Sequence, residues 1–140
     1  MLVEDAAELL ELVHRISHRF RRGYRARLEP LGLSPGQARA LKVLMEAGEP
    51  LRMVRLAEAL RIAPRSVTPV VDALEESGLV RREVDPANRR STLLVLTDAG
   101  RAAFGQVKRV RAEVAAELFA PLAPERREEL RELLALVDEP

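Results

Sequence analysis

Apolar residues recur every three or four positions along most of this chain, a spacing that predicts a mainly helical protein. The first stripe extends from Leu2 to Leu28 and predicts one helix of about seven turns, which is long for 140 residues. Its apolar positions are Ala6, Leu9, Leu10, Val13, Ile16, Phe20, Tyr24 and Leu28. The opposite face carries Arg15, Arg19, Arg22 and Arg25.

Three shorter helices are predicted in the middle of the chain. Ser34 followed by Pro35 has the pattern of a helix start, and this helix continues to a stop at Gly48. The next helix covers 53–60, and a break at 62–64 separates it from another helix that ends at Gly78. Two short helices with a tight connection are a candidate helix-turn-helix.

After Gly78 the pattern changes to two β-prone runs, 79–84 and 91–96, on either side of the polar segment 85–90. They predict a hairpin with an arginine-tipped turn. Thr97 is expected to cap a helix that continues to the break at Ala120-Pro121. A final helix is expected from Pro124, with its apolar face buried at Leu130, Leu133, Leu134 and Val137.

Composition narrows the function classes. The absence of cysteine excludes disulfides, thiolate nucleophiles and thiol-based redox sensing. Residues 113–140 hold eight acids and three arginines, so a formal charge of +1 divides into −5 for this tail and +6 for the rest. The longest apolar run is far shorter than a bilayer span, and the N-terminus lacks the pattern of a secretion signal. We therefore expect one cytoplasmic domain with no membrane partner.

The helix after the break at 62–64 has two distinct faces. Val67, Val70, Val71 and Leu74 share one face and are predicted to be buried, which leaves Arg65, Thr68, Pro69 and Asp72 on the outer side. A short polar and partly basic face on the second helix of a helix-turn-helix suits a DNA major groove. The alternative is an ordinary solvated helix face. Pro69 would be costly inside a helix, so we expect a late start with Ser66 as the N-cap, or a bend.

The hairpin offers a second candidate contact with DNA. Arg89 and Arg90 lie at or beside its tip, where a β-ribbon can place arginine in a minor groove. Asp85, across the turn, is expected to accept a hydrogen bond from one of these guanidinium groups and to orient the other outward. The alternative is a surface hairpin whose charges only keep a sheet edge soluble.

Residues 85–100, read as DPANRRSTLLVLTDAG, resemble the wing signature of the MarR family of winged-helix transcriptional regulators. The signature has two acids, two arginines, a strand and then Leu-Thr-x-x-Gly. The resemblance extends to 56–60, 66–80 and 122–127, and so covers essentially the whole chain. Two positions depart from the pattern. Asn88 replaces the second acid and changes the ion pairs expected in the wing, and Pro69 replaces a longer polar residue, which favours contact with a thymine methyl group.

The resemblance implies a mainly α fold with a small β-hairpin wing. It places a winged helix-turn-helix at about 32–98 and dimerisation helices at about 2–30 and 99–138. It further implies a homodimer on a pseudo-palindromic operator in double-stranded DNA, and a repressor released by a small aromatic or phenolic ligand. The DNA-binding residues would be Arg65, Ser66, Thr68, Pro69, Asp72, Arg89 and Arg90, with Asp85 and Asn88 orienting the wing. The alternative is a helical protein-interaction module of the same fold that has lost DNA binding.

The two histidines, His14 and His18, share one face of the first predicted helix near Glu11. This spacing could hold zinc, but the sequence has no further cluster of ligands, so we expect no metal and no other cofactor. The alternative is that His14 and His18 are partly buried polar residues at a dimer surface or beside a ligand pocket. No glycine-flanked serine elbow occurs, and catalysis has no support in the sequence.

Overall fold

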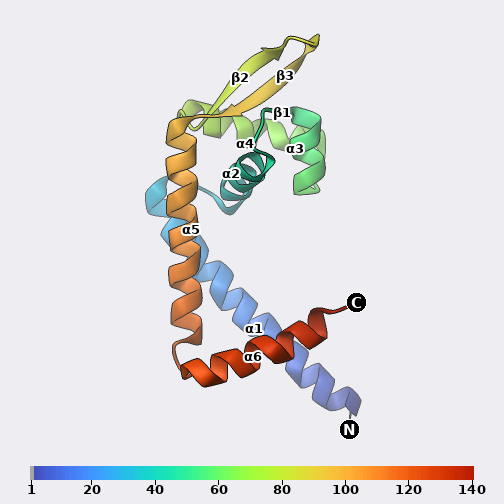
Figure 1. Ribbon diagram of the computed structural model, residues 1–140, viewed down its shortest axis with the longest axis vertical. Helices are drawn as coiled ribbons and strands as arrows, with labels where there is room; N and C mark the ends of the chain where they lie inside the picture. The colour runs from blue at the N-terminus through green and yellow to red at the C-terminus, as the bar shows by residue number, and fades with distance from the viewer. Residues whose placement is uncertain (1) are drawn as a thin grey trace. The chain divides into compact units, whose positions relative to one another are not determined.

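The structure is a computed structural model that describes residues 2–140. Its helices are α1 (Leu2–Leu28), a short 3-10 helix η1 (Glu29–Leu31), α2 (Pro35–Ala47), α3 (Met53–Leu60), α4 (Pro64–Glu76), α5 (Asp98–Phe119) and α6 (Pro124–Asp138). Its strands are β1 (Leu51–Arg52), β2 (Val80–Asp85) and β3 (Asn88–Leu96) (Figure 1). The predicted fold class, helical with a small β-hairpin, is therefore confirmed. No helix of the described chain is long and apolar enough to span a membrane.

The chain divides into two compact units. One comprises residues 25–110, and the other combines residues up to 24 with residues 111–140. For convenience we call them the winged unit and the helical unit. Both α1 and α5 run from one unit into the other, because the divisions fall inside these helices.

The core of the winged unit lies between α2, α3 and α4. Its side chains are almost entirely inaccessible to solvent, and the largest of them are Leu28, Leu41, Leu56, Leu74 and Leu94. Arg39 of α2 also donates a hydrogen bond to the carbonyl of Leu60, with 3.1 Å between the atoms, and so ties α2 to the end of α3. Packing of this kind holds the two helices of the helix-turn-helix at a fixed angle.

The sheet of the winged unit has the strand order β1-β3-β2, and both pairings are antiparallel. The two residues of β1 were not predicted as a strand, because a segment this short has no readable alternation. The hairpin turn contains only Pro86 and Ala87, which is shorter than the predicted segment 85–90. The register shifts between Val84 and Asp85, so residues 89–91 of β3 have no paired residue on β2. This bulge places both wing arginines beside the tip.

Two predicted helix caps are confirmed. The Ser34 hydroxyl accepts a hydrogen bond from the Gln37 amide, and the Gln37 side-chain oxygen accepts one from the Ser34 amide, both at 3.1 Å. The Thr97 hydroxyl accepts from the Gly100 amide at 3.0 Å and donates to the Gly78 carbonyl at 2.7 Å. Thr97 therefore joins the start of α5 to the turn that follows α4.

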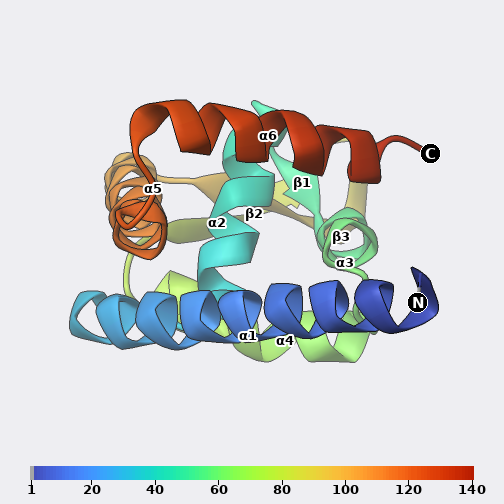
Figure 2. The same cartoon turned by 90° about the horizontal axis from the view of Figure 1, so that it is seen from below.

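In the helical unit, α1 and α5 contact one another at Gly23, where an added Cβ would lie 3.2 Å from a Val114 methyl group. Phe20 stacks on Tyr24 with 5.5 Å between the ring centroids, and the Arg111 guanidinium lies 5.1 Å from the Phe20 centroid. Burial raises the pKa of Tyr24, and the nearby charge of Arg111 opposes this shift. Helices α1 and α6 cross in projection in Figure 1, but Figure 2 shows them apart.

The predicted burial of the apolar face of α6 does not occur within one chain. Leu133 and Val137 are 60% and 83% exposed, and Leu130 is half-buried. On α1, Leu9, Leu10 and Val13 are also exposed. The predicted helices form, but within residues 2–140 no neighbouring element covers the apolar faces of α1 and α6.

Candidate nucleic-acid interface

The outer face of α4 is held in place by the core beneath it. Val67, Val71 and Leu74 are buried, whereas Val70 is half-buried rather than buried as predicted. The opposite face exposes Arg65, Thr68, Pro69 and Asp72, as the periodicity predicts, and Ser66 is exposed as well. Four polar or small side chains therefore share one accessible face of a rigidly packed helix.

The predicted late start of α4 is wrong. The helix begins at Pro64 with Ala63 as its N-cap, and the Ser66 amide donates to the Ala63 carbonyl at 2.8 Å. Ser66 is thus already inside the first turn, and Pro69 lies in the helix interior. Proline at this point removes the hydrogen bond that would reach the Arg65 carbonyl. Burial of Val67, Val71 and Leu74 in the core keeps the helix continuous despite that loss.

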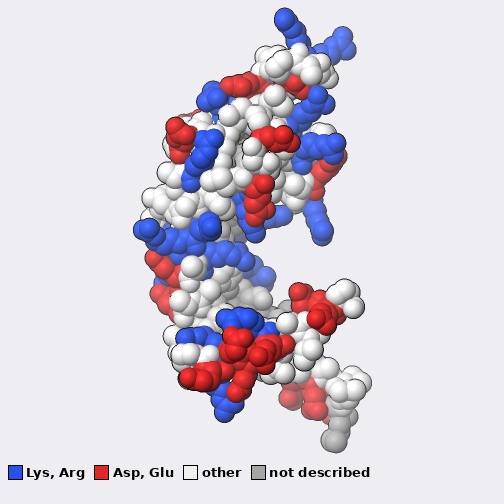
Figure 3. Space-filling model, viewed as in Figure 1, with Lys and Arg blue, Asp and Glu red and all other residues white. Residues whose placement is uncertain are grey.

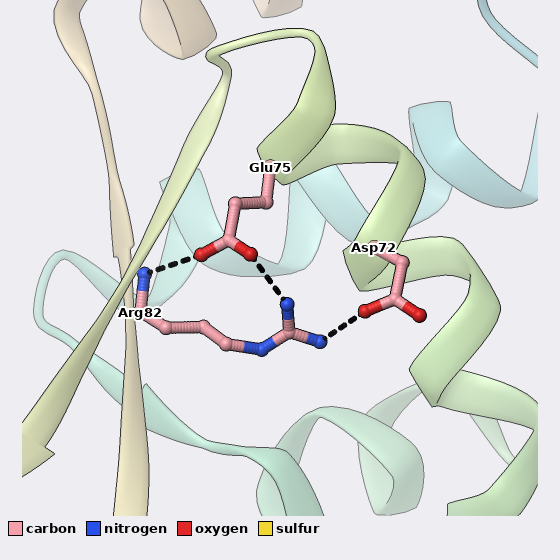
Figure 4. A network of polar contacts seen from close by, with 3 residues as sticks. All are labelled: Asp72, Glu75 and Arg82. Carbon is pink, nitrogen blue, oxygen red and sulfur yellow. Dashed lines mark hydrogen bonds and ion pairs between the residues drawn. The ribbon is translucent and has the colours of Figure 1, made fainter.

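Asp72 is paired with Arg82 of β2, an arrangement that sequence reasoning missed (Figure 4). The Arg82 guanidinium contacts Asp72 and Glu75 at 2.6 Å each, and the Arg82 amide donates to Glu75 at 3.3 Å. The hydrogen bond to Asp72 is the main reason that the pKa of Arg82 is raised. These contacts join α4 to the base of the wing, so Asp72 braces the helix in addition to being exposed beside Thr68 and Pro69.

The expected contact between Asp85 and a wing arginine is replaced by one with Arg52 of β1. Arg52 donates from Nε at 2.9 Å and from its terminal nitrogen at 2.7 Å. The Ala87 amide donates to the other oxygen of Asp85 at 2.9 Å. This amide and then Arg52 lower the pKa of Asp85, whose side chain is almost fully buried. Asp85 therefore fixes the turn to β1 and leaves both wing arginines uninvolved.

Asn88 orders the other side of the turn, because its side-chain oxygen accepts a hydrogen bond from the Arg90 amide at 3.1 Å. Arg89 and Arg90 are exposed, and within residues 2–140 their guanidinium groups have no hydrogen bond or ion pair. Basic side chains project from the end of the hairpin at the top of Figure 3. Two cations are therefore presented at the start of β3, beside a turn whose backbone is held on both sides.

Five arginines of the candidate interface fall into two groups. Arg52 and Arg82 are bound to carboxylates and brace the structure. Arg65, Arg89 and Arg90 are exposed, and the described chain offers their side chains no partner. The sequence identified the second group by its position on a helix face and at a turn. It missed the bracing group, because residues 7 to 33 positions apart on different elements carry no signal of their pairing.

His14 and His18 are both exposed on α1, and within residues 2–140 no group of three acidic or histidine residues could hold a metal ion. A hollow of about 260 Å³ on the helical unit is lined by other residues, namely Ile16, Ser17, Phe20, Arg21, Ala115, Leu118 and Phe119. The structure therefore does not bring the two histidines into this hollow.

Comparison with known proteins agrees with this geometry. The MarR family model matches residues 33–92, which contain the helix-turn-helix and most of the wing. An uncharacterized HTH-type transcriptional regulator of Mycobacterium bovis is 33% identical over 138 residues, which are 96% of this chain and 93% of the relative. This chain belongs to the MarR family. The resemblance seen in the sequence is thereby confirmed.

Two further proteins similar to this chain are named by their role or their ligand. An HTH-type transcriptional repressor of Mycobacterium bovis is 31% identical over 129 residues, covering 91% of this chain and 92% of the relative. The crystal structure of a MarR family protein of Mycobacterium tuberculosis in complex with DNA matches with a TM-score of 0.77 at 25% identity, over 94% of this chain and 98% of that one. The chain spans 66% and 46% of the length of two Bacillus subtilis relatives. The MarR family is one of transcriptional regulators rather than enzymes.

Proposed function

We propose that this MarR family member is a DNA-binding transcriptional repressor that acts as a homodimer on a pseudo-palindromic operator. The observation that carries the proposal is the pair of exposed guanidinium groups of Arg89 and Arg90, which have no partner within the described residues and lie beside a turn fixed by Asp85 and Asn88. A narrow minor groove concentrates negative potential and attracts arginine held in this way. The matched family member bound to DNA supports the same interpretation.

Helix α4 supplies the sequence-reading surface in this proposal. Arg65 can donate two hydrogen bonds to guanine, and the Thr68 hydroxyl can contact a base edge. Pro69 presents an apolar ring that suits a thymine methyl group. Ser66 lies within the first turn and can donate to a phosphate. Asp72, held by Arg82, keeps this face at a fixed angle to the wing.

The dimer follows from the uncovered apolar faces of α1 and α6. Exposed leucine and valine side chains along both helices form a surface that a second copy can bury. Two copies related by a twofold axis present two α4 helices, which suits half-sites spaced about 10 bp apart. A role on DNA also places the protein with the chromosome, in agreement with the cytoplasmic location expected from the sequence.

Release by a small aromatic or phenolic ligand is the regulatory part of the proposal. The hollow on the helical unit combines apolar walls, including Phe20 and Phe119, with the cation of Arg21 at its edge. A ring with an acidic substituent matches that combination. The repressor name of one close relative supports negative regulation.

The first experiment measures binding to genomic fragments selected by the purified protein, over a series of salt concentrations. We expect affinity to fall steeply with salt, because phosphate contacts release counterions. Replacing Arg89 or Arg90 with Ala should weaken binding by about 1–3 kcal/mol without changing the thermal midpoint. Arg109→Ala, on α5, removes the same charge elsewhere and should change binding much less.

The results distinguish a DNA-binding repressor from a protein-interaction module of the same fold. Unchanged affinity in both wing variants would reject the wing as a DNA contact. Failure of the wild-type protein to select any fragment would favour the protein-interaction module instead. A reporter gene placed behind a selected fragment then tests repression, which should be relieved when a binding aromatic acid is added.

A further inference from the structure

Arg61 occupies the turn between α3 and α4 and has an unusual backbone conformation. Its φ of 56° and ψ of 44° place it in the left-handed region. Within residues 2–140 it is the one residue other than glycine with a positive φ. A side chain is unfavourable there, because its Cβ crowds the carbonyl oxygen that follows.

The turn itself explains why the backbone adopts this conformation. The Arg61 amide donates to the Glu58 carbonyl at 3.1 Å, and the Ile62 amide donates to the Ala57 carbonyl at 3.2 Å. Together these bonds close the end of α3 in the manner that usually selects glycine. The chain places glycine at its other positive-φ positions, Gly32, Gly48 and Gly78. Arginine at this helix end is therefore the exception within the same molecule.

The fold makes no use of the Arg61 side chain. The residue is exposed, and its guanidinium group has no hydrogen bond or ion pair within the described chain. Its neighbour Arg55, in contrast, pairs with Glu58 at 3.2 Å. Arg61 precedes Arg65 by four residues, and α4 begins three residues after it at Pro64. A conformation that costs stability, bearing a cation unpartnered within the described chain in the turn that precedes the candidate DNA-reading helix, is a feature expected of a functional residue.

We propose that Arg61 binds a phosphate group of the DNA backbone beside the groove that receives α4. A guanidinium group can donate two parallel hydrogen bonds to phosphate oxygens, and such contacts fix the position of a protein on the duplex without reading sequence. The proposal rests on the proposed function, since it requires α4 to lie on DNA. It assigns Arg61 a positional role, distinct from the base contacts of Arg65 and Thr68.

The test uses the full chain and two variants, Arg61→Gly and Arg61→Lys. Glycine relieves the backbone strain and removes the cation, so Arg61→Gly should melt at the wild-type temperature or above. The same variant should bind selected operator and unrelated DNA about 3- to 10-fold more weakly, and its plot of log affinity against log salt should be less steep by about 1. Arg61→Lys keeps a cation and should recover most of the affinity. Arg109→Ala is the charge-matched control and should change affinity less than 2-fold, about 0.4 kcal/mol by the conversion of 1.4 kcal/mol per tenfold.

Two results would overturn the inference while leaving the proposed function intact. One is wild-type affinity and salt dependence in Arg61→Gly. The other is a loss confined to the operator, which would make Arg61 a reader of bases. If the wild-type protein binds no DNA at any salt concentration, the proposed function fails and this inference fails with it.

Discussion

The winged unit and the helical unit differ in how far they bury their apolar side chains. Every buried apolar side chain of the described chain lies within residues 25–110, with the exception of Val114. The helical unit instead exposes most of its large apolar side chains, including Leu9 and Leu10 of α1 and Leu133 and Leu136 of α6. One unit encloses a core of its own, whereas the other leaves a large apolar surface exposed.

Because of this difference, substitutions in the two units should affect different properties. In the winged unit the stability of the fold depends on side chains within one chain. In the helical unit, under the proposed homodimer, the same kind of residue should affect association instead. Paired variants, one in each unit or one on each side of a single element, can therefore test this difference between the two units.

The largest expected effect is that of Val71→Asp. Val71 lies on the inner face of α4 and is fully buried, so the new carboxylate would be enclosed without a partner. We expect a loss of at least about 3 kcal/mol, enough to abolish the cooperative melting transition of the winged unit. Circular dichroism on heating measures it. Val54→Asp is the control, because Val54 is half exposed on α3 and should tolerate the charge. A normal transition in Val71→Asp would show that this core is not closed.

A smaller effect is expected when the same substitution is made on α6. Leu133 is 60% exposed in one chain, so Leu133→Asp should leave the transition of the winged unit in place. It should raise the dissociation constant of the dimer by about 30-fold, or about 2 kcal/mol, as for a central interface residue. Sedimentation equilibrium measures the constant, with the neighbouring Glu132→Gln as control. An unchanged constant would remove α6 from the proposed interface.

The sequence predicted most of this contrast, because periodicity reports which positions of a helix are apolar. It located α1, α2, α4 and the hairpin, and it placed Arg65 and Thr68 on the outer face of α4. Periodicity cannot report what covers an apolar face, which is why burial was expected at Leu133. It also cannot report ion pairs between distant segments, which is why Asp85 was assigned to a wing arginine instead of Arg52.

Two glycines of α5 give a prediction inside the winged unit. A Cβ on Gly100 would lie 2.1 Å from the Leu79 carbonyl oxygen, so Gly100→Ala must displace the backbone next to the Thr97 cap. We expect a loss of about 1–3 kcal/mol. Gly105 has open space around it, and Gly105→Ala should instead stabilise the helix by about 0.5–1 kcal/mol. Chemical denaturation of the two variants should therefore give shifts of opposite sign. Shifts of the same sign would contradict the close approach of α5 to Leu79.

The smallest effect concerns pH. The Ala87 amide and Arg52 lower the pKa of Asp85, so its contribution to stability is complete above the ordinary carboxyl range and is lost as the pH falls below about 4. Asp85→Asn should therefore melt at a lower temperature than wild type at neutral pH. The difference should shrink as both proteins are acidified. A difference that stays constant from pH 7 to pH 3 would show that the charge of Asp85 does not support the wing.

The most direct test of the account is the mass of the complex that the protein forms with a selected genomic fragment, measured by sedimentation at moderate salt. The account predicts two chains of 15.6 kDa on one duplex containing a pseudo-palindromic site. It also predicts that the complex is lost on removal of both Arg89 and Arg90 while the free dimer remains. One chain per duplex, or a complex that survives without both wing arginines, would contradict it.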